Sequence, residues 1–80
     1  MTRREFIELA KEEGVGESLL CFDKIYKEDA FVVRKDGAVW IVYYCERGDA
    51  NFKKYYNSES DALIDLLEKF RLMRIRRESW

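Results

Sequence analysis

The pair Asp36-Gly37 constrains the fold most, because it separates two short runs rich in β-branched and aromatic residues, 30–35 and 38–45. An Asp-Gly pair between two such runs is typical of a two-residue β-hairpin turn. The two runs are therefore predicted to be antiparallel neighbours in a sheet. With Asp36-Gly37 as the turn, the expected cross-strand pairs are Val33 with Trp40, Phe31 with Val42, Val32 with Ile41 and Ala30 with Tyr43.

Two amphipathic segments flank the hairpin and predict helices over 2–13 and 58–74, because their apolar residues recur at intervals of three and four. The expected N-terminal capping pairs are Thr2 with Glu5 and Ser58 with Asp61. Gly14 is expected to end the first helix, since glycine readily adopts the left-handed conformation found after a helix C-terminus.

Two further strands are predicted at about 19–26 and 51–56, the second after a loop over 46–50 in which Gly48 supplies a positive φ. The order is then helix, three or four antiparallel strands, helix. Neither helix can bury its apolar stripe alone, so both must pack on the sheet. The sequence therefore predicts an α+β fold, a two-layer sandwich, in a single domain over 1–80.

The hairpin would present two apolar faces, and two helices can cover only one of them. The face expected under the helices consists of Phe31, Val33, Trp40, Val42 and Tyr44. The other face consists of Val32, Val39, Ile41, Tyr43 and Cys45. An exposed apolar face bordered by charge marks a partner surface. The alternative, which the sequence leaves open, is that a helix or the N-terminal loop covers this face.

The sequence lacks the common motifs of catalytic and metal sites. It contains no histidine, which excludes histidine-based triads and histidine-ligated metals. The glycines of Gly14-Val15-Gly16 are too few for a nucleotide-binding loop. Without histidine, a cysteine nucleophile would need a lysine or a carboxylate as its base. We therefore expect no enzymatic activity, no cofactor, no metal and no small-molecule substrate.

Cys21 and Cys45 stand among apolar residues, and we expect two buried, reduced thiols rather than a disulfide or a reactive thiol. The longest apolar run, 38–45, is too short to span a bilayer, so no membrane association is expected. Acidic residues interrupt any signal-peptide core near the N-terminus. These features favour a cytoplasmic protein.

Charge is unevenly distributed along the chain, although 16 acidic and 15 basic residues nearly cancel. Acidic residues outnumber basic ones over 5–68, whereas 69–80 carries five basic residues and one acidic residue. An acidic body could attract a basic partner, or the charges could simply be solvated. The basic C-terminal helix suggests the alternative of a nucleic-acid-associated or regulatory module. Double-stranded RNA-binding domains share the order of elements but open their second helix with lysines, where this chain has Ser58-Glu59-Ser60-Asp61, so nucleic acid is disfavoured.

The segment from Trp40 to Ala62, about a quarter of the chain, carries a recognisable pattern. A Trp-x-Val-Tyr strand leads into the turn Glu46-Arg47-Gly48, and an aromatic residue, Ser-Glu and Ala open the last helix. This pattern resembles small immunity proteins of bacterial polymorphic-toxin and contact-dependent growth inhibition systems. The chain departs from it in Tyr56, where a phenylalanine is expected, and in its basic tail.

The resemblance implies a cytoplasmic protein that binds a cognate toxin domain and neutralises it, and many toxins of this class are nucleases. It also implies that Trp40 and Val42 lie in the core and that Glu59 pairs with Arg47. We expect the partner to bind the uncovered sheet face and the adjoining turn. The predicted partner-binding residues are Ile41, Tyr43, Glu46, Arg47 and Asp49.

Overall fold

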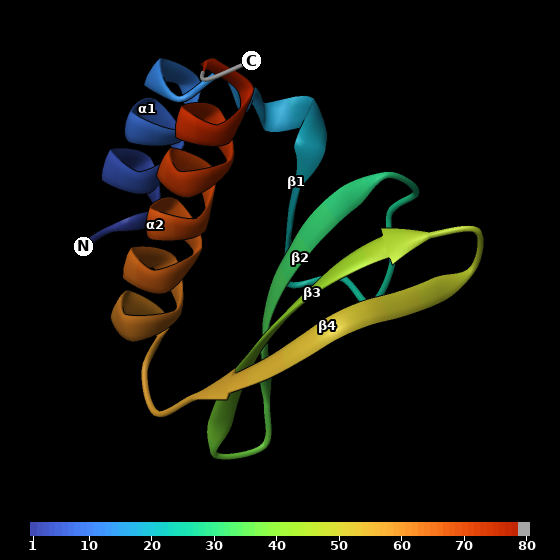
Figure 1. The fold of residues 1–80 in the computed structure, drawn as a ribbon. Helices are drawn as coiled ribbons and strands as arrows, with labels where there is room; N and C mark the ends of the chain where they lie inside the picture. The colour runs from blue at the N-terminus through green and yellow to red at the C-terminus, as the bar shows by residue number, and fades with distance from the viewer. Residues whose placement is uncertain (79–80) are drawn as a thin grey trace.

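The computed structural model describes residues 1–78, with side chains described up to Arg74. Two helices lie side by side in one layer and a four-stranded sheet forms the other (Figure 1). The α+β fold predicted from the sequence is confirmed. Its elements are α1 (Arg3–Glu12), the 3-10 turn η1 (Glu17–Leu19), β1 (Leu20–Phe22), β2 (Ala30–Asp36), β3 (Val39–Glu46), β4 (Asp49–Tyr56) and α2 (Glu59–Glu78).

Both helices begin at the capping residues that the sequence predicts. The Thr2 hydroxyl accepts a hydrogen bond from the Glu5 amide, and the Glu5 carboxylate accepts one from the Thr2 amide, both at 3.2 Å. The Ser58 hydroxyl accepts a hydrogen bond from the Asp61 amide at 3.1 Å. These bonds satisfy amides that have no partner within the helix. α2 continues to Glu78, beyond the predicted end at 74.

The first strand differs from its prediction in both length and direction. Only Leu20–Phe22 is extended, and it pairs in parallel with β2, so the sheet is mixed rather than wholly antiparallel. Because β1 and β2 run in the same direction, the chain must cross back from the end of β1 to the start of β2. Seven residues, 23–29, make this return, with positive φ at Asp23 (66°) and Asp29 (54°).

The hairpin of β2 and β3 is confirmed, but its register differs from the expected one by two residues. Asp36 pairs with Val39, so the turn is Gly37-Ala38 and Val33 faces Val42. Gly37 has φ +63°, a conformation that costs glycine little. Because side chains alternate with a period of two, a shift of two residues leaves every side chain on its predicted face.

Apolar residues are buried on both faces of the sheet. The larger core, between the helices and the sheet, consists of Phe6, Ala10, Val15, Leu20, Val33, Val42, Ala62, Leu63, Leu66, Leu67 and Phe70. Trp40 is half-buried against this core, whereas Val42 is fully part of it. A second cluster on the opposite face consists of Cys21, Ala30, Val32, Ile41, Tyr43 and Cys45. Both cysteines are free and buried, as expected.

Candidate functional site: an apolar groove and the adjoining turn

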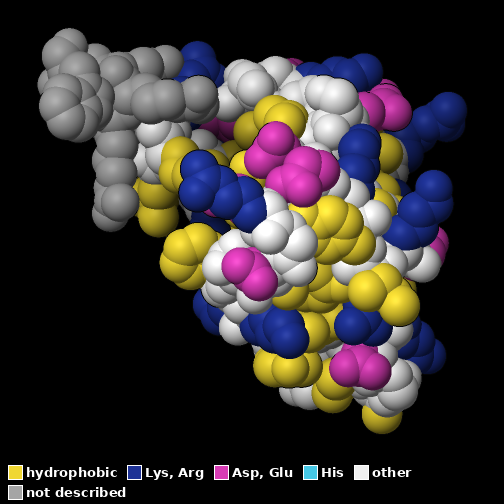
Figure 2. Space-filling model, turned by 90° about the vertical axis from the view of Figure 1, so that its right-hand side faces the viewer, with side chains coloured by type: hydrophobic (Ala, Val, Ile, Leu, Met, Phe, Trp, Pro, Cys, Tyr) yellow, Lys and Arg dark blue, Asp and Glu magenta, His cyan; other side chains and the backbone are white. Residues whose placement is uncertain are grey.

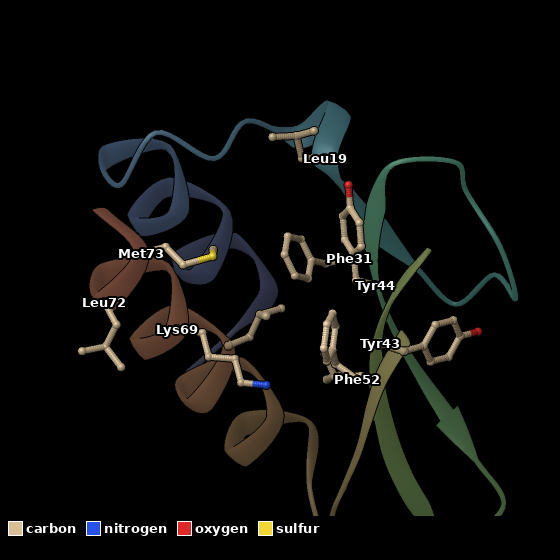
Figure 3. Close-up of a pocket in the computed structure, with 10 residues that line it drawn as sticks. Leu19, Phe31, Tyr43, Tyr44, Phe52, Lys69, Leu72 and Met73 are labelled. Atoms are coloured by element: carbon tan, nitrogen blue, oxygen red, sulfur yellow. The ribbon is translucent and has the colours of Figure 1, made fainter. Parts of the chain in front are cut away.

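An apolar groove opens between α2 and the sheet (Figure 3). Its volume is about 680 Å³, which lies within the range of ligand and partner sites. Its lining is almost entirely apolar or aromatic and includes one cation, Lys69. The lining residues are Leu19, Phe31, Val42, Tyr43, Tyr44, Phe52, Leu66, Lys69, Leu72 and Met73.

Aromatic rings in tilted and edge-on contact form the inner wall of the groove. The Phe31 ring lies 4.9 Å from the Tyr44 ring and 5.1 Å from the Phe70 ring, measured between centroids. Aromatic contacts of this kind hold the side chains in fixed positions. Burial and the nearby charges of Asp29, Glu46 and Glu28 raise the pKa of Tyr44. The Tyr44 end of the groove therefore lies in a negative field, whereas Lys69 supplies a positive charge on the α2 side.

Phe52 is the most unusual residue of the groove. It lies in β4 where the pairing with β3 shifts between Val42 and Tyr44, so two residues of β4 oppose Tyr43 in a β-bulge. Its φ is +61°, in the left-handed region that bulky residues avoid, and its side chain is 82% exposed. The ring lies on the side of the sheet that faces α2 (Figure 3). The chain thus holds a large exposed aromatic side chain in a strained conformation at the groove.

The rim of the groove adds further exposed apolar area. Leu72 is 57% exposed, Met73 40% and Leu19 39%. Met73 points from α2 toward the sheet, whereas Leu72 lies on the outer side of the helix (Figure 3). Such grouped exposure of large apolar side chains is characteristic of interaction surfaces.

Two of the predicted partner-binding residues are not exposed. Ile41 is 2% exposed and Tyr43 3%, so the expectation of an uncovered sheet face centred on them is wrong. The connection 23–29 crosses this face, and the Tyr43 hydroxyl donates a hydrogen bond to the Ile25 carbonyl. Arg34 donates to the same hydroxyl at 3.0 Å and lies over the ring. The connection 23–29 therefore covers the face, and not a helix or the N-terminal loop as in the sequence-based alternative.

The other three predicted residues, Glu46, Arg47 and Asp49, are exposed at the turn between β3 and β4. Arg47 (φ 53°) and Gly48 (φ 82°) both have positive φ, as a tight two-residue hairpin turn requires. The predicted loop over 46–50 is therefore shorter than expected, with only these two residues outside the strands.

The connection 23–29 also fixes this turn. The Tyr26 hydroxyl donates to the Glu28 carboxylate at 2.8 Å and accepts from the Gly48 amide at 2.7 Å. The Arg47 amide donates to Glu28 at 2.6 Å. Burial and the hydrogen bond to Glu28 raise the pKa of Tyr26. The turn and the connection thus form one ordered surface that carries several acidic side chains.

Glu59 does not pair with Arg47. Its carboxylate accepts a hydrogen bond at 2.8 Å from Arg3, which also contacts both oxygens of Asp23. The Arg3 guanidinium lies 5.0 Å from the centroid of the Phe22 ring. The predicted pairing fails because Arg47 occupies the tip of the β3–β4 hairpin, whereas Glu59 begins α2 next to the N-terminus.

The outer side of the sheet carries charges of both signs around a band of hydrophobic side chains (Figure 2). By register Tyr55 shares this face with Ile41, and its side chain is 58% exposed. Ile25, on the connection that covers this face, is 74% exposed. This face thus carries exposed apolar side chains among charged ones.

The structure groups no residues for metal binding within its described part, where no three His, Cys, Asp or Glu side chains come together. Neither helix, as far as the chain is described, is long and apolar enough to cross a membrane. Comparisons with models of protein families, with curated proteins and with solved structures found no match.

Sequence reasoning missed the groove, including Leu19, Phe52, Lys69 and Leu72. Phe52 was expected in a regular strand alternating with Lys53, and no glycine or asparagine marks its left-handed conformation. One feature of the sequence does indicate exposed apolar area. Leu72 falls outside the stripe that predicts the buried face of α2, so its side chain is expected in solvent.

Proposed function

We propose that this protein is an immunity protein that binds a cognate toxin domain and neutralises it in the cytoplasm of a bacterium. The pattern from Trp40 to Ala62 supports the assignment to this class. The two free cysteines support a reducing compartment. Neutralisation by binding needs no catalytic group, and we propose no enzymatic activity.

The proposal of a binding function depends on one observation, that Phe52 combines a strained backbone conformation with high exposure. A residue in a sparsely populated backbone conformation costs about 1–3 kcal/mol and is concentrated at functional sites. Phe52 gains little burial within the chain in return, since 82% of its side chain is exposed. An aromatic side chain held in this way beside an apolar groove is suited to anchor a protein partner.

The turn next to the groove supplies charge for the encounter with that partner. Glu46 and Asp49 are exposed there, and Glu28 is held beside them by the Arg47 amide. Acidic side chains at the edge of an interface attract a basic partner and accelerate association. Many nucleases have basic substrate clefts, and a nuclease toxin domain would therefore be complementary to this turn.

The alternative function, a nucleic-acid-associated module using the basic end of α2, has weaker support. Arg74 donates to the Glu12 carbonyl at 2.9 Å and lies 3.5 Å from the Glu13 carboxylate. Arg71 lies 4.0 Å from the same carboxylate. These two cations already have partners in α1, and the first turn of α2 is acidic.

The test expresses the reading frames next to the gene in its native genome one at a time, and the proposal predicts that one of them encodes a toxin domain. Bacteria expressing that domain should grow only when this protein is co-expressed. The purified proteins should form a stable complex in size-exclusion chromatography with light scattering. Full toxicity in the presence of excess folded protein, or toxin activity unchanged by it in solution, would contradict the proposal.

A further inference from the structure

We infer that the apolar groove receives an amphipathic α-helix of the toxin domain. This helix would place apolar side chains against Phe52 and Met73 and a carboxylate against Lys69. The inference rests on the proposed function and adds the chemistry of the partner segment that occupies the site.

The distribution of apolar area favours a macromolecule over a small ligand. A small molecule would fill the volume of about 680 Å³ and leave the outer parts of the rim in water. Phe52 and Leu72, however, are 82% and 57% exposed, and Leu72 lies on the outer side of α2 (Figure 3). Only a partner that fills the groove and also extends over its rim would bury both.

Lys69 specifies the charge of the partner segment. Its side chain extends from α2 toward the sheet within the groove (Figure 3). The nearest acid on the same helix face, Asp65, already accepts hydrogen bonds from Tyr56 at 2.5 Å and Lys54 at 2.9 Å. Lys69 lowers the pKa of Asp65 through its charge but makes none of these bonds. Lys69 is half-buried among apolar side chains, and its ammonium group would form a charge-assisted hydrogen bond with a carboxylate of the partner.

The bulge in β4 favours a helix over an added strand. β4 is one of the two edge strands, and an extended segment could extend the sheet at this edge only by pairing with the β4 backbone. Phe52 and Lys53 interrupt the regular strand at its middle, and bulges of this kind protect edges from such pairing. A helix needs no backbone partner, and it presents side chains at i, i+3 and i+4 to a groove.

A second copy of this chain is a poor match for the groove. Two of the apolar residues of α1, Phe6 and Ala10, are buried in their own molecule, and the other two, Ile7 and Leu9, pack half-buried against its core. Pairing of two grooves would place Lys69 of one copy near Lys69 of the other. Like charges placed together in this way oppose association.

The test measures the affinity of the toxin domain by calorimetry for the wild-type protein and for charge variants. Lys69→Glu should weaken binding by roughly 30-fold or more, and Lys69→Met by less, since it retains an apolar stem. Lys35→Glu is the matched control, because Lys35 lies at the opposite end of the hairpin from Tyr44. The affinity of this variant for the toxin domain should stay within about twofold of wild type. Hydrogen exchange of the toxin domain in the complex should then show a protected helix. Replacing an acidic residue of that helix by lysine should restore binding to Lys69→Glu.

Four other results would overturn the inference, and each identifies a different alternative. Wild-type affinity in Lys69→Glu would mean that the toxin domain binds elsewhere, with the proposed function intact. Protection of an extended toxin segment, together with slowed exchange of β4 amides, would indicate strand addition instead. A concentration-dependent dimer of the isolated protein that Phe52→Gly abolishes would identify a second copy as the occupant. No binding by the wild-type protein would remove the proposed function as well.

Discussion

At the scale of single residues, Phe52 shows how local strain and surface exposure combine. Its left-handed backbone allows β4 to include an extra residue, and its ring remains largely in solvent beside the groove. Glycine would adopt the same φ at lower cost. The proposed partner surface would give the phenylalanine side chain a use that the isolated fold does not.

Replacing Phe52 by glycine should therefore stabilise the protein. Relief of left-handed strain contributes about 1–2 kcal/mol, and the extra flexibility of glycine in the unfolded chain costs about 0.5–1 kcal/mol. The expected net gain is about 0.5–1 kcal/mol in the free energy of unfolding, measured by urea denaturation. Lys53→Gly is the control, because Lys53 does not have a positive φ and should lose about 0.5–1 kcal/mol. A loss of more than about 1 kcal/mol in Phe52→Gly would refute the strain argument.

Tyr43 is a second residue whose role differs from its prediction, because its hydroxyl holds the connection 23–29 rather than a partner. Tyr43→Phe removes the bonds to Arg34 and to the Ile25 carbonyl and should cost about 1 kcal/mol of stability. Amides within 23–29 should also exchange faster with solvent. Wild-type exchange rates in this segment would show that the hydroxyl does not hold the connection.

At the scale of elements, Asp65 joins α2 to β4 and should make their contact dependent on pH. Hydrogen bonds from Tyr56 and then Lys54 lower the pKa of Asp65. A carboxylate with a lowered pKa stabilises the folded state above its unfolded value of about 3.9, and this contribution is lost as the pH falls through the folded value. The stability difference between wild type and Asp65→Asn should thus be constant from about pH 8 to 5 and shrink below about pH 4. Glu68→Gln, on the exposed side of α2, controls for the loss of one acidic residue. A difference that persists unchanged to pH 2 would contradict this role.

The elements also show how far the sequence determines this fold. Both helix starts, the hairpin and the assignment of its faces follow from capping residues, propensity and alternation, which are local properties. The parallel pairing of β1 does not, because it depends on the path of 23–29, where left-handed Asp23 and Asp29 carry no glycine signal. For the same reason the burial of Ile41 and Tyr43 could not be predicted, and the groove arises only when α2, η1 and β4 are assembled.

At the scale of the whole molecule, the acidic turn and the single cation of the groove, Lys69, place opposite charges on the proposed partner surface. Asp49→Lys should slow association with a basic toxin domain and change dissociation little, because exposed rim charges act mainly during the encounter. The effect should be largest at low ionic strength and fade as the Debye length falls to about 8 Å at 0.15 M salt. Stopped-flow kinetics at several salt concentrations measures this directly. An association rate independent of residue 49 at low salt would mean that the turn lies away from the approaching partner.

The most direct test of the central claim, that Phe52 and the apolar groove form the partner surface, is the affinity of Phe52→Gly for the toxin domain by calorimetry. The account predicts a variant at least as stable as wild type whose dissociation constant is higher by roughly 30-fold or more, as expected for the loss of an aromatic anchor. A stable Phe52→Gly protein that binds the toxin domain with wild-type affinity would contradict it.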